Sequence, residues 1–156
     1  MPDTPDLRLS PARSGSVLGF DFGLKRLGIA VGTLDLGLAH PLETIASEIN
    51  AIRFERIAAL IGEWQPVLLV VGMPHHDDGT PHEFAPTCLR FAHRLKGRFG
   101  LPVAWVDERY SSATASMALN QSGVRGRKQK PMLDQVAAQQ ILQQYFDESE
   151  SAHELA

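Results

Sequence analysis

Residues 19–32 read GFDFGLKRLGIAVG, and this stretch predicts two adjacent buried strands joined by a tight turn. Apolar residues dominate 17–22 and 27–33, and Gly23 to Arg26 supplies the turn between them. Asp21 is the one acid in the stretch. An ionised carboxylate in an apolar strand is costly unless it is paired, hydrogen-bonded or bound to a metal. Asp21 therefore needs a partner that compensates its charge, in a structural or a functional role.

Three interpretations of Asp21 compete. It could be a structural residue that caps the turn, which is slightly favoured when the stretch is taken alone. It could belong to a phosphate-binding hairpin of the actin-like and sugar-kinase ATPases, or bind metal in a nuclease. The ATPase interpretation is disfavoured because those folds close two related domains over the nucleotide, whereas 156 residues are enough for one.

The composition is that of a globular domain, with 44% hydrophobic and 21% charged residues. We expect a disordered lead-in over 1–16, a single domain over 17–147, and an acidic flexible tail over 148–156. The one cysteine, Cys88, excludes an intramolecular disulfide and is compatible with a reducing compartment. Its place on an apolar helix stripe favours packing over nucleophilic chemistry. No apolar run reaches the roughly 20 residues that span a bilayer, so we expect no membrane association.

Hydrophobic periodicity predicts the order of helices and strands. Strands are expected at 17–22, 27–33, 38–45, 66–74 and 101–108. Four helices are expected. The first covers about 50–64, with a buried face of Ile52, Ile57, Leu60 and Ile61, and the second has an apolar stripe of Phe84, Cys88, Phe91, Leu95 and Phe99. The third follows a cap at Ser111 or Ser112, and the last runs from Pro131 to about Asp147. Three antiparallel strands followed by βαβ units predict an α/β protein of the RNase H-like fold, a mixed five-stranded sheet with helices on both faces.

Acidic residues stand at the ends of several of these elements. Asp21 closes the first strand, Asp107 and Glu108 close the last strand, and Asp134 lies in the first turn of the final helix. Each has a plain structural explanation, such as compensation of the helix macrodipole for Asp134. The carboxyl ends of parallel strands meet at one edge of a sheet, however, so these acids can converge. Converging carboxylates suit Mg²⁺ or Mn²⁺, and a pair of such ions suits phosphodiester cleavage.

A basic loop, GVRGRKQKP, precedes Asp134 and contributes a possible phosphate clamp. A net charge of −3 argues against a general nucleic-acid binder, so the local distribution matters more. The candidate nucleic-acid-binding residues are Lys25, Arg26, Arg109, Arg125, Arg127, Lys128 and Lys130. The segment HHDDGTPH holds His75, His76 and His82, but adjacent histidines do not easily face one ion, and solvated loop histidines are favoured over a zinc site.

Several motifs in one order resemble the YqgF family, whose members are described as Holliday-junction-resolvase-like proteins and as pre-16S rRNA nucleases. The motifs are GFDFGLKRLGIAVG, VVGMP followed by DGT, VDERYSS, and GVRGRKQKPMLDQVAAQQIL. The resemblance implies an RNase H-like nuclease in the cytoplasm that matures the 5′ end of 16S rRNA, with an older attribution to DNA junction resolution. It assigns the acidic positions to Asp21, Glu108 and Asp134, and thereby selects Glu108 over Asp107. The loop at His75 to Asp78 departs from the family pattern.

Two alternatives stay open. The chain could be a resolvase-like nuclease that acts on branched DNA, or a catalytically weak RNA-binding factor in ribosome assembly. The sequence does not decide between RNA and DNA, and it does not distinguish a monomer from a homodimer.

Overall fold

The computed structural model describes residues 15–74, 83–108, 129–148 and 153–154. No helix in these ranges is long and apolar enough to cross a membrane. The helix expected after Ser111 or Ser112 lies outside the described residues.

The centre of the fold is a mixed sheet with the strand order β3-β2-β1-β4-β5-β6. β1 pairs antiparallel with β2 and parallel with β4, and β4 pairs parallel with β5. The five predicted strands are confirmed to within two residues at each end. The strands are β1 (Ser16–Phe22), β2 (Leu27–Thr33), β3 (Leu38–Ile45), β4 (Pro66–Met73), β5 (Val103–Asp107) and β6 (His153–Glu154).

The two-residue strand β6 was not expected. It pairs antiparallel with Ala104 and Trp105 of β5, within the segment for which the sequence indicated an acidic tail. An unpaired edge strand exposes backbone hydrogen-bonding groups, and a short pairing of this kind covers part of that edge. Two residues are too few for a periodic signal in the sequence.

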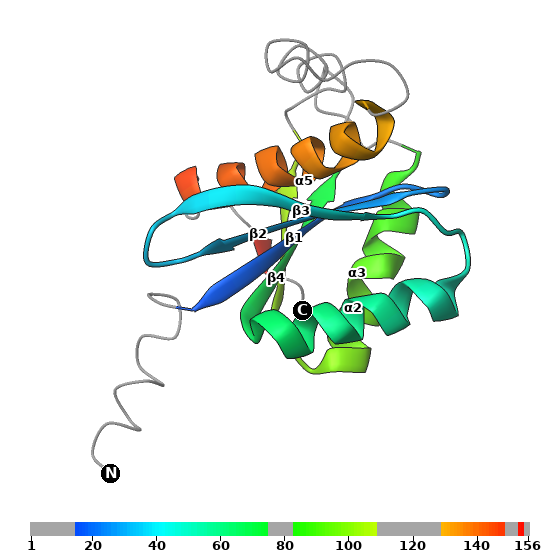
Figure 1. Ribbon diagram of the computed structural model, residues 1–156, viewed down its shortest axis with the longest axis horizontal. Helices are drawn as coiled ribbons and strands as arrows, with labels where there is room; N and C mark the ends of the chain where they lie inside the picture. Colours follow the sequence, from blue (N-terminus) through cyan, green and yellow to red (C-terminus); the bar gives the residue numbers. More distant parts are fainter. Residues whose placement is uncertain (1–14, 75–82, 109–128, 149–152, 155–156) are drawn as a thin grey trace.

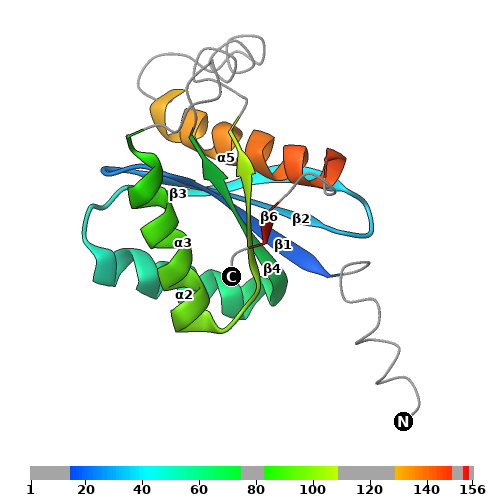
Figure 2. The same cartoon turned by 180° about the vertical axis from the view of Figure 1, so that it is seen from behind.

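Helices cover both faces of the sheet, as predicted. Figures 1 and 2 show α2 (Asn50–Trp64) and α3 (Ala85–Phe99) on one face and α5 (Gln129–Asp147) on the other. Each face has its own core. On the α2/α3 face this core includes Leu18, Phe20, Ile57, Leu69 and Phe91, and on the α5 face it includes Val17, Ala30, Val70, Val106 and Ile141.

The buried face of α2 differs from the prediction at one position. Ile52 was expected inside, yet its side chain is 46% exposed, whereas Arg53 is 2% exposed. The buried stripe continues through Phe54, Ile57 and Leu60. Arg53 can be buried because backbone carbonyls accept hydrogen bonds from its guanidinium, as described below, and Ile52 then turns outward.

Glycines allow α5 to lie close against the sheet. A Cβ added at Gly19 would lie 2.8 Å from Cβ of Leu142, and one added at Gly72 would lie 2.4 Å from Cδ1 of Ile141. Real Cβ atoms do not approach other atoms this closely, so larger residues would push the helix away. The small residues on this face therefore fix the distance between α5 and the central strands.

Candidate active site

Asp21 lies on the face of the sheet that α5 covers. Successive side chains of β1 alternate, so Leu18 and Phe20 contribute to the α2/α3 core and Val17 to the α5 core. Asp21 has the same parity as Val17. It is directly opposite Gly28 in the antiparallel register of β1 and β2, and opposed residues point to the same face.

Gly28 brings Asp134 to the same place. A Cβ added at Gly28 would lie 2.0 Å from the backbone oxygen of Asp134. The second turn of α5 therefore rests directly on the backbone of β2, beside the cross-strand neighbour Asp21. No residue other than glycine fits at this contact without moving the helix.

Glu108 follows the end of β5 at the same edge of the sheet. Its backbone N–H donates a hydrogen bond to the carbonyl of Met73, 2.8 Å away, at the end of β4. Val106 belongs to the α5 core, so strand alternation puts Asp107, the last residue of β5, on the opposite face. Glu108 follows the strand directly, and its charge acts on Asp21. The choice of Glu108 over Asp107, which the residue pattern alone left open, stays a prediction, and the effect of Glu108 on Asp21 supports it.

The other two acids act on Asp21. Loss of hydration on burial, repulsion from Glu108 and repulsion from Asp134, in this order of size, raise the pKa of Asp21 to about 8. Burial also raises the pKa of Glu108. The Asp21 carboxyl therefore holds a proton at neutral pH unless a cation replaces it. A carboxyl group perturbed in this way is typical of functional sites.

Asp134 is farther into the helix than predicted. α5 begins at Gln129 rather than Pro131, so Asp134 lies in the second turn and the first turn has no acid. The macrodipole effect falls off within the first turn, which weakens that explanation of Asp134. Its Oδ2 instead accepts a hydrogen bond from Nε of Arg26 at 2.6 Å, with side-chain exposures of 38% for Arg26 and 18% for Asp134.

The donor atoms suit a hard divalent cation, but a finished metal site is not formed. Across the described residues, no group of three acidic, histidine or cysteine side chains is arranged to hold an ion. Asp21, Glu108 and Asp134 supply the oxygen ligands that Mg²⁺ and Mn²⁺ prefer, and a cation would relieve the repulsion that Glu108 and Asp134 exert on Asp21. The Arg26 guanidinium engages one of the three carboxylates.

The candidate nucleic-acid-binding residues are only partly described. Lys25 is exposed in the β1–β2 turn and Arg26 is half-buried beside it. The backbone of Lys130 belongs to the first turn of α5. The other basic candidates and the three loop histidines fall outside the described residues; these are Arg109, Arg125, Arg127, Lys128, His75, His76 and His82.

Cys88 is buried on α3, with 2% exposure. Burial, then Glu108, then Asp21 raise the pKa of its thiol to about 12, so it stays neutral. A neutral buried thiol is a poor nucleophile, and the packing role predicted for Cys88 fits this environment.

One residue close to the site was missed by the sequence reasoning. Arg53 of α2 donates a hydrogen bond from an Nη nitrogen to the carbonyl of Leu24 at 3.0 Å, and another from Nε to the carbonyl of Ser47. Its guanidinium also lies 5.3 Å from the ring centroid of Phe22. Arg53 therefore holds the β1–β2 turn that carries Lys25 and Arg26. Burial lowers its pKa.

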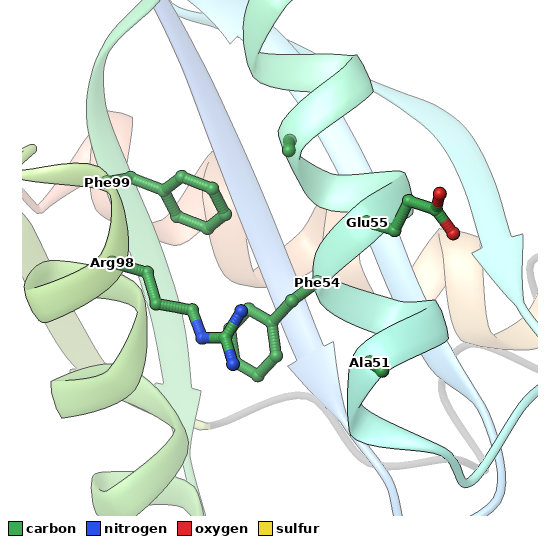
Figure 3. Close-up of a pocket in the computed structure, with 6 residues that line it drawn as sticks. Ala51, Phe54, Glu55, Arg98 and Phe99 are labelled. Atoms are coloured by element: carbon green, nitrogen blue, oxygen red, sulfur yellow. The ribbon is translucent and has the colours of Figure 1, made fainter.

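A pocket of about 550 Å³ lies elsewhere, between α2 and α3. Figure 3 shows the Arg98 guanidinium over the ring of Phe54, at 4.5 Å from the centroid, with Glu55 and Ala51 along α2. These helices cover the opposite face of the sheet from α5, so this pocket is separate from the acids.

Three solved structures with a similar fold are resolvases. A Thermus thermophilus RuvC structure matches with a TM-score of 0.52 and 16% identity, over 90% of this chain and 99% of the other. RuvC from the same organism in complex with a Holliday junction substrate gives 0.53 at 19% identity, over 90% and 99%. A fowlpox virus resolvase with junction DNA gives 0.53 at 11%, over 85% and 97%. The predicted RNase H-like fold is therefore confirmed.

The sequence comparisons identify the family. The family model described as RuvX, Holliday junction resolvase, matches residues 15–148, and the chain belongs to this family of nucleases. Relatives provisionally named pre-16S rRNA nucleases occur in Nitrosomonas eutropha, 54% identical over 97% of this chain and 99% of the relative, and in Methylobacillus flagellatus, 61% identical over 88% and 95%. The resemblance to the YqgF family is thus confirmed.

Proposed function

We propose that this nuclease hydrolyses phosphodiester bonds with divalent metal ions, Mg²⁺ or Mn²⁺, held by Asp21, Glu108 and Asp134. The observation that carries the proposal is geometric: Asp21 lies opposite Gly28 in the β1–β2 register, and the backbone of Asp134 packs directly on Gly28. The raised pKa of Asp21, caused by burial and by the charges of Glu108 and Asp134, supports it. When bound, a pair of such ions would activate a water molecule and stabilise the leaving oxygen. The carboxyl of Asp21 would give up its proton to solvent in order to act as a ligand.

The positive side chains would bind the substrate backbone. Lys25 is exposed on the turn that follows Asp21. Arg125, Arg127, Lys128 and Lys130 precede Asp134 closely in the sequence, and Arg109 follows Glu108. We expect these residues to contact phosphates rather than bases, because Lys and Arg neutralise backbone charge without reading sequence.

The proposed substrate is the 5′ end of precursor 16S rRNA, within ribosomal particles. This choice is supported by the provisional names of relatives that are 54% and 61% identical over most of the chain. A ribosomal RNA precursor is a cytoplasmic substrate in bacteria, so we propose a cytoplasmic location as well.

A second candidate is cleavage of four-way DNA junctions. It is favoured by the family description and by the RuvC fold of the chain. Symmetric cleavage of two junction strands would require a homodimer, whereas trimming an RNA end requires only a monomer. The two candidates therefore also differ in the oligomeric state that they demand.

Wild type and Asp21→Asn, each with Mg²⁺ or Mn²⁺, should be compared on a 16S precursor fragment and on a four-way junction. Cleavage of the RNA by wild type only would support the proposal, and cleavage of the junction only would support the second candidate. Asp35→Asn is a matched control, because Asp35 is exposed in the β2–β3 turn. If neither substrate is cut while RNA is still bound, the protein acts as an RNA-binding assembly factor instead.

Charge reversal at Arg125, Arg127 and Lys128 should weaken nucleic-acid binding and flatten its salt dependence, by roughly one unit of slope for each lost phosphate contact. Arg94→Glu, on the exposed side of α3, controls for charge reversal away from the acids. An unchanged salt slope in the triple variant would exclude the clamp.

A further inference from the structure

We infer that Arg26 competes with the metal ion for Asp134, so that nucleic-acid binding and metal binding are coupled through this one guanidinium. The inference rests on the proposed function and concerns the regulation of that same site. It starts from the ion pair between Nε of Arg26 and Oδ2 of Asp134, whose two atoms are 2.6 Å apart.

The pair joins two structural elements. Arg26 ends the β1–β2 turn and Asp134 lies in α5, 108 positions along the chain. The contact at Gly28 keeps the backbone of Asp134 in place on β2. Rotation of side chains can therefore break the ion pair while the backbone of Asp134 keeps its place beside Asp21.

The charges explain why Arg26 would resist metal uptake. A guanidinium bonded to Asp134 occupies an oxygen that a cation needs, and its positive charge repels an incoming divalent ion. The engagement of Asp134 by Arg26 also agrees with the finding that, among the described residues, no three side chains are arranged to hold a metal ion. Asp134 is held by a protein cation until that cation is drawn away.

A phosphate group supplies the means to draw it away. Arg26 is 38% exposed, so its remaining N–H groups can reach a ligand from solvent. Guanidinium groups bind phosphate with two parallel hydrogen bonds, which is a stronger arrangement than a single N–H bond to a carboxylate. A nucleic-acid backbone that takes Arg26 would leave Asp134 free for the metal. Metal loading would then follow substrate binding.

Calorimetric titration with Mn²⁺ in the absence of nucleic acid tests the competition without any activity measurement. Arg26→Gln should bind Mn²⁺ about tenfold more tightly than wild type, because a repelling charge and a competing donor are both removed. Arg26→Lys retains the charge and should bind at most a few-fold more tightly. In an Asp134→Asn background, Arg26→Gln should raise the Mn²⁺ affinity only through the removal of one repelling charge. The difference in Mn²⁺ affinity that Arg26→Gln makes should therefore be markedly smaller there than in the wild-type background.

The side-chain ¹H–¹⁵N signal of Arg26 gives a second readout in the wild-type protein, assigned by its loss in Arg26→Gln. Mg²⁺ should shift this signal as Asp134 is released, and a short DNA oligonucleotide added without metal should shift it as well. Equal Mn²⁺ affinity of wild type and Arg26→Gln would overturn the inference and leave the proposed metal site intact. Failure of both proteins to take up Mn²⁺ at millimolar concentration would overturn both.

Discussion

Replacement of Asp21 by Asn should stabilise the metal-free protein, and the gain should depend on pH. The pKa of Asp21 is raised from 3.8 to about 8 in the folded chain. Between these values the folded protein keeps a proton that the unfolded chain releases, so wild-type stability falls as the pH rises through this window. Above about pH 8 both states are ionised, and the penalty becomes constant. Asn carries no charge and escapes the penalty.

The pKa shift sets the magnitude. A difference of about four units at 1.36 kcal/mol per unit gives a ceiling of roughly 5 kcal/mol. Asp21 keeps some contact with solvent, and relaxation around the charge reduces the penalty, so we expect about 1–3 kcal/mol. Such a gain on removal of a functional group is the usual trade between stability and activity.

Urea denaturation with a chelator present, at about pH 5 and about pH 9, measures this gain for wild type and Asp21→Asn. The control is Asp35→Asn, an exposed residue whose side chain accepts a hydrogen bond from the N–H of Gly15, which an amide oxygen can still accept. The reasoning is refuted if Asp21→Asn is no more stable than wild type at the higher pH, or if its gain is equal at both pH values.

Two further predictions concern the residues that support the site. Gly28→Ala should cost about 3 kcal/mol of unfolding free energy in urea denaturation, because its Cβ would lie 2.0 Å from the Asp134 carbonyl oxygen. Gly62→Ala is the control, because Gly62 has open space around it in α2, and it should gain about 0.5–1 kcal/mol. Equal effects of the two substitutions would contradict the packing at Gly28. Arg53→Met should lose about 2–3 kcal/mol in the same assay because two carbonyls lose a charged donor, and Arg53→Lys should lose less. No loss in Arg53→Met would mean that water replaces both bonds.

The sequence predicted the strands and helices well because each apolar pattern is local. The continuous run at 66–73 and the regular spacing of Cys88, Phe91 and Leu95 need no knowledge of the rest of the chain. The antiparallel pairing of β1 with β2 also followed from the tight turn predicted between them, although the register that sets Asp21 opposite Gly28 did not.

The remaining features depend on contacts between distant segments. Arg53 is a charged residue on an apolar stripe, and only the carbonyls of Leu24 and Ser47 explain its burial. The ion pair of Arg26 and Asp134 joins positions that no local pattern relates. The choice between Asp107 and Glu108 could not be made from a strand that is apolar on both faces, because alternation then gives no signal.

The proposed nuclease site on the α5 face is tested most directly by a comparison of two neighbouring acids. Glu108→Gln and Asp107→Asn should be assayed with Mg²⁺ or Mn²⁺ on whichever of the two substrates, the 16S precursor fragment or the four-way junction, wild type cleaves. The charge of Glu108 acts on Asp21, whereas strand parity puts Asp107 on the opposite face. We therefore predict a loss of about a hundredfold or more for Glu108→Gln and nearly full activity for Asp107→Asn. Full activity of Glu108→Gln, or an equal loss in both variants, would contradict the assignment of the site.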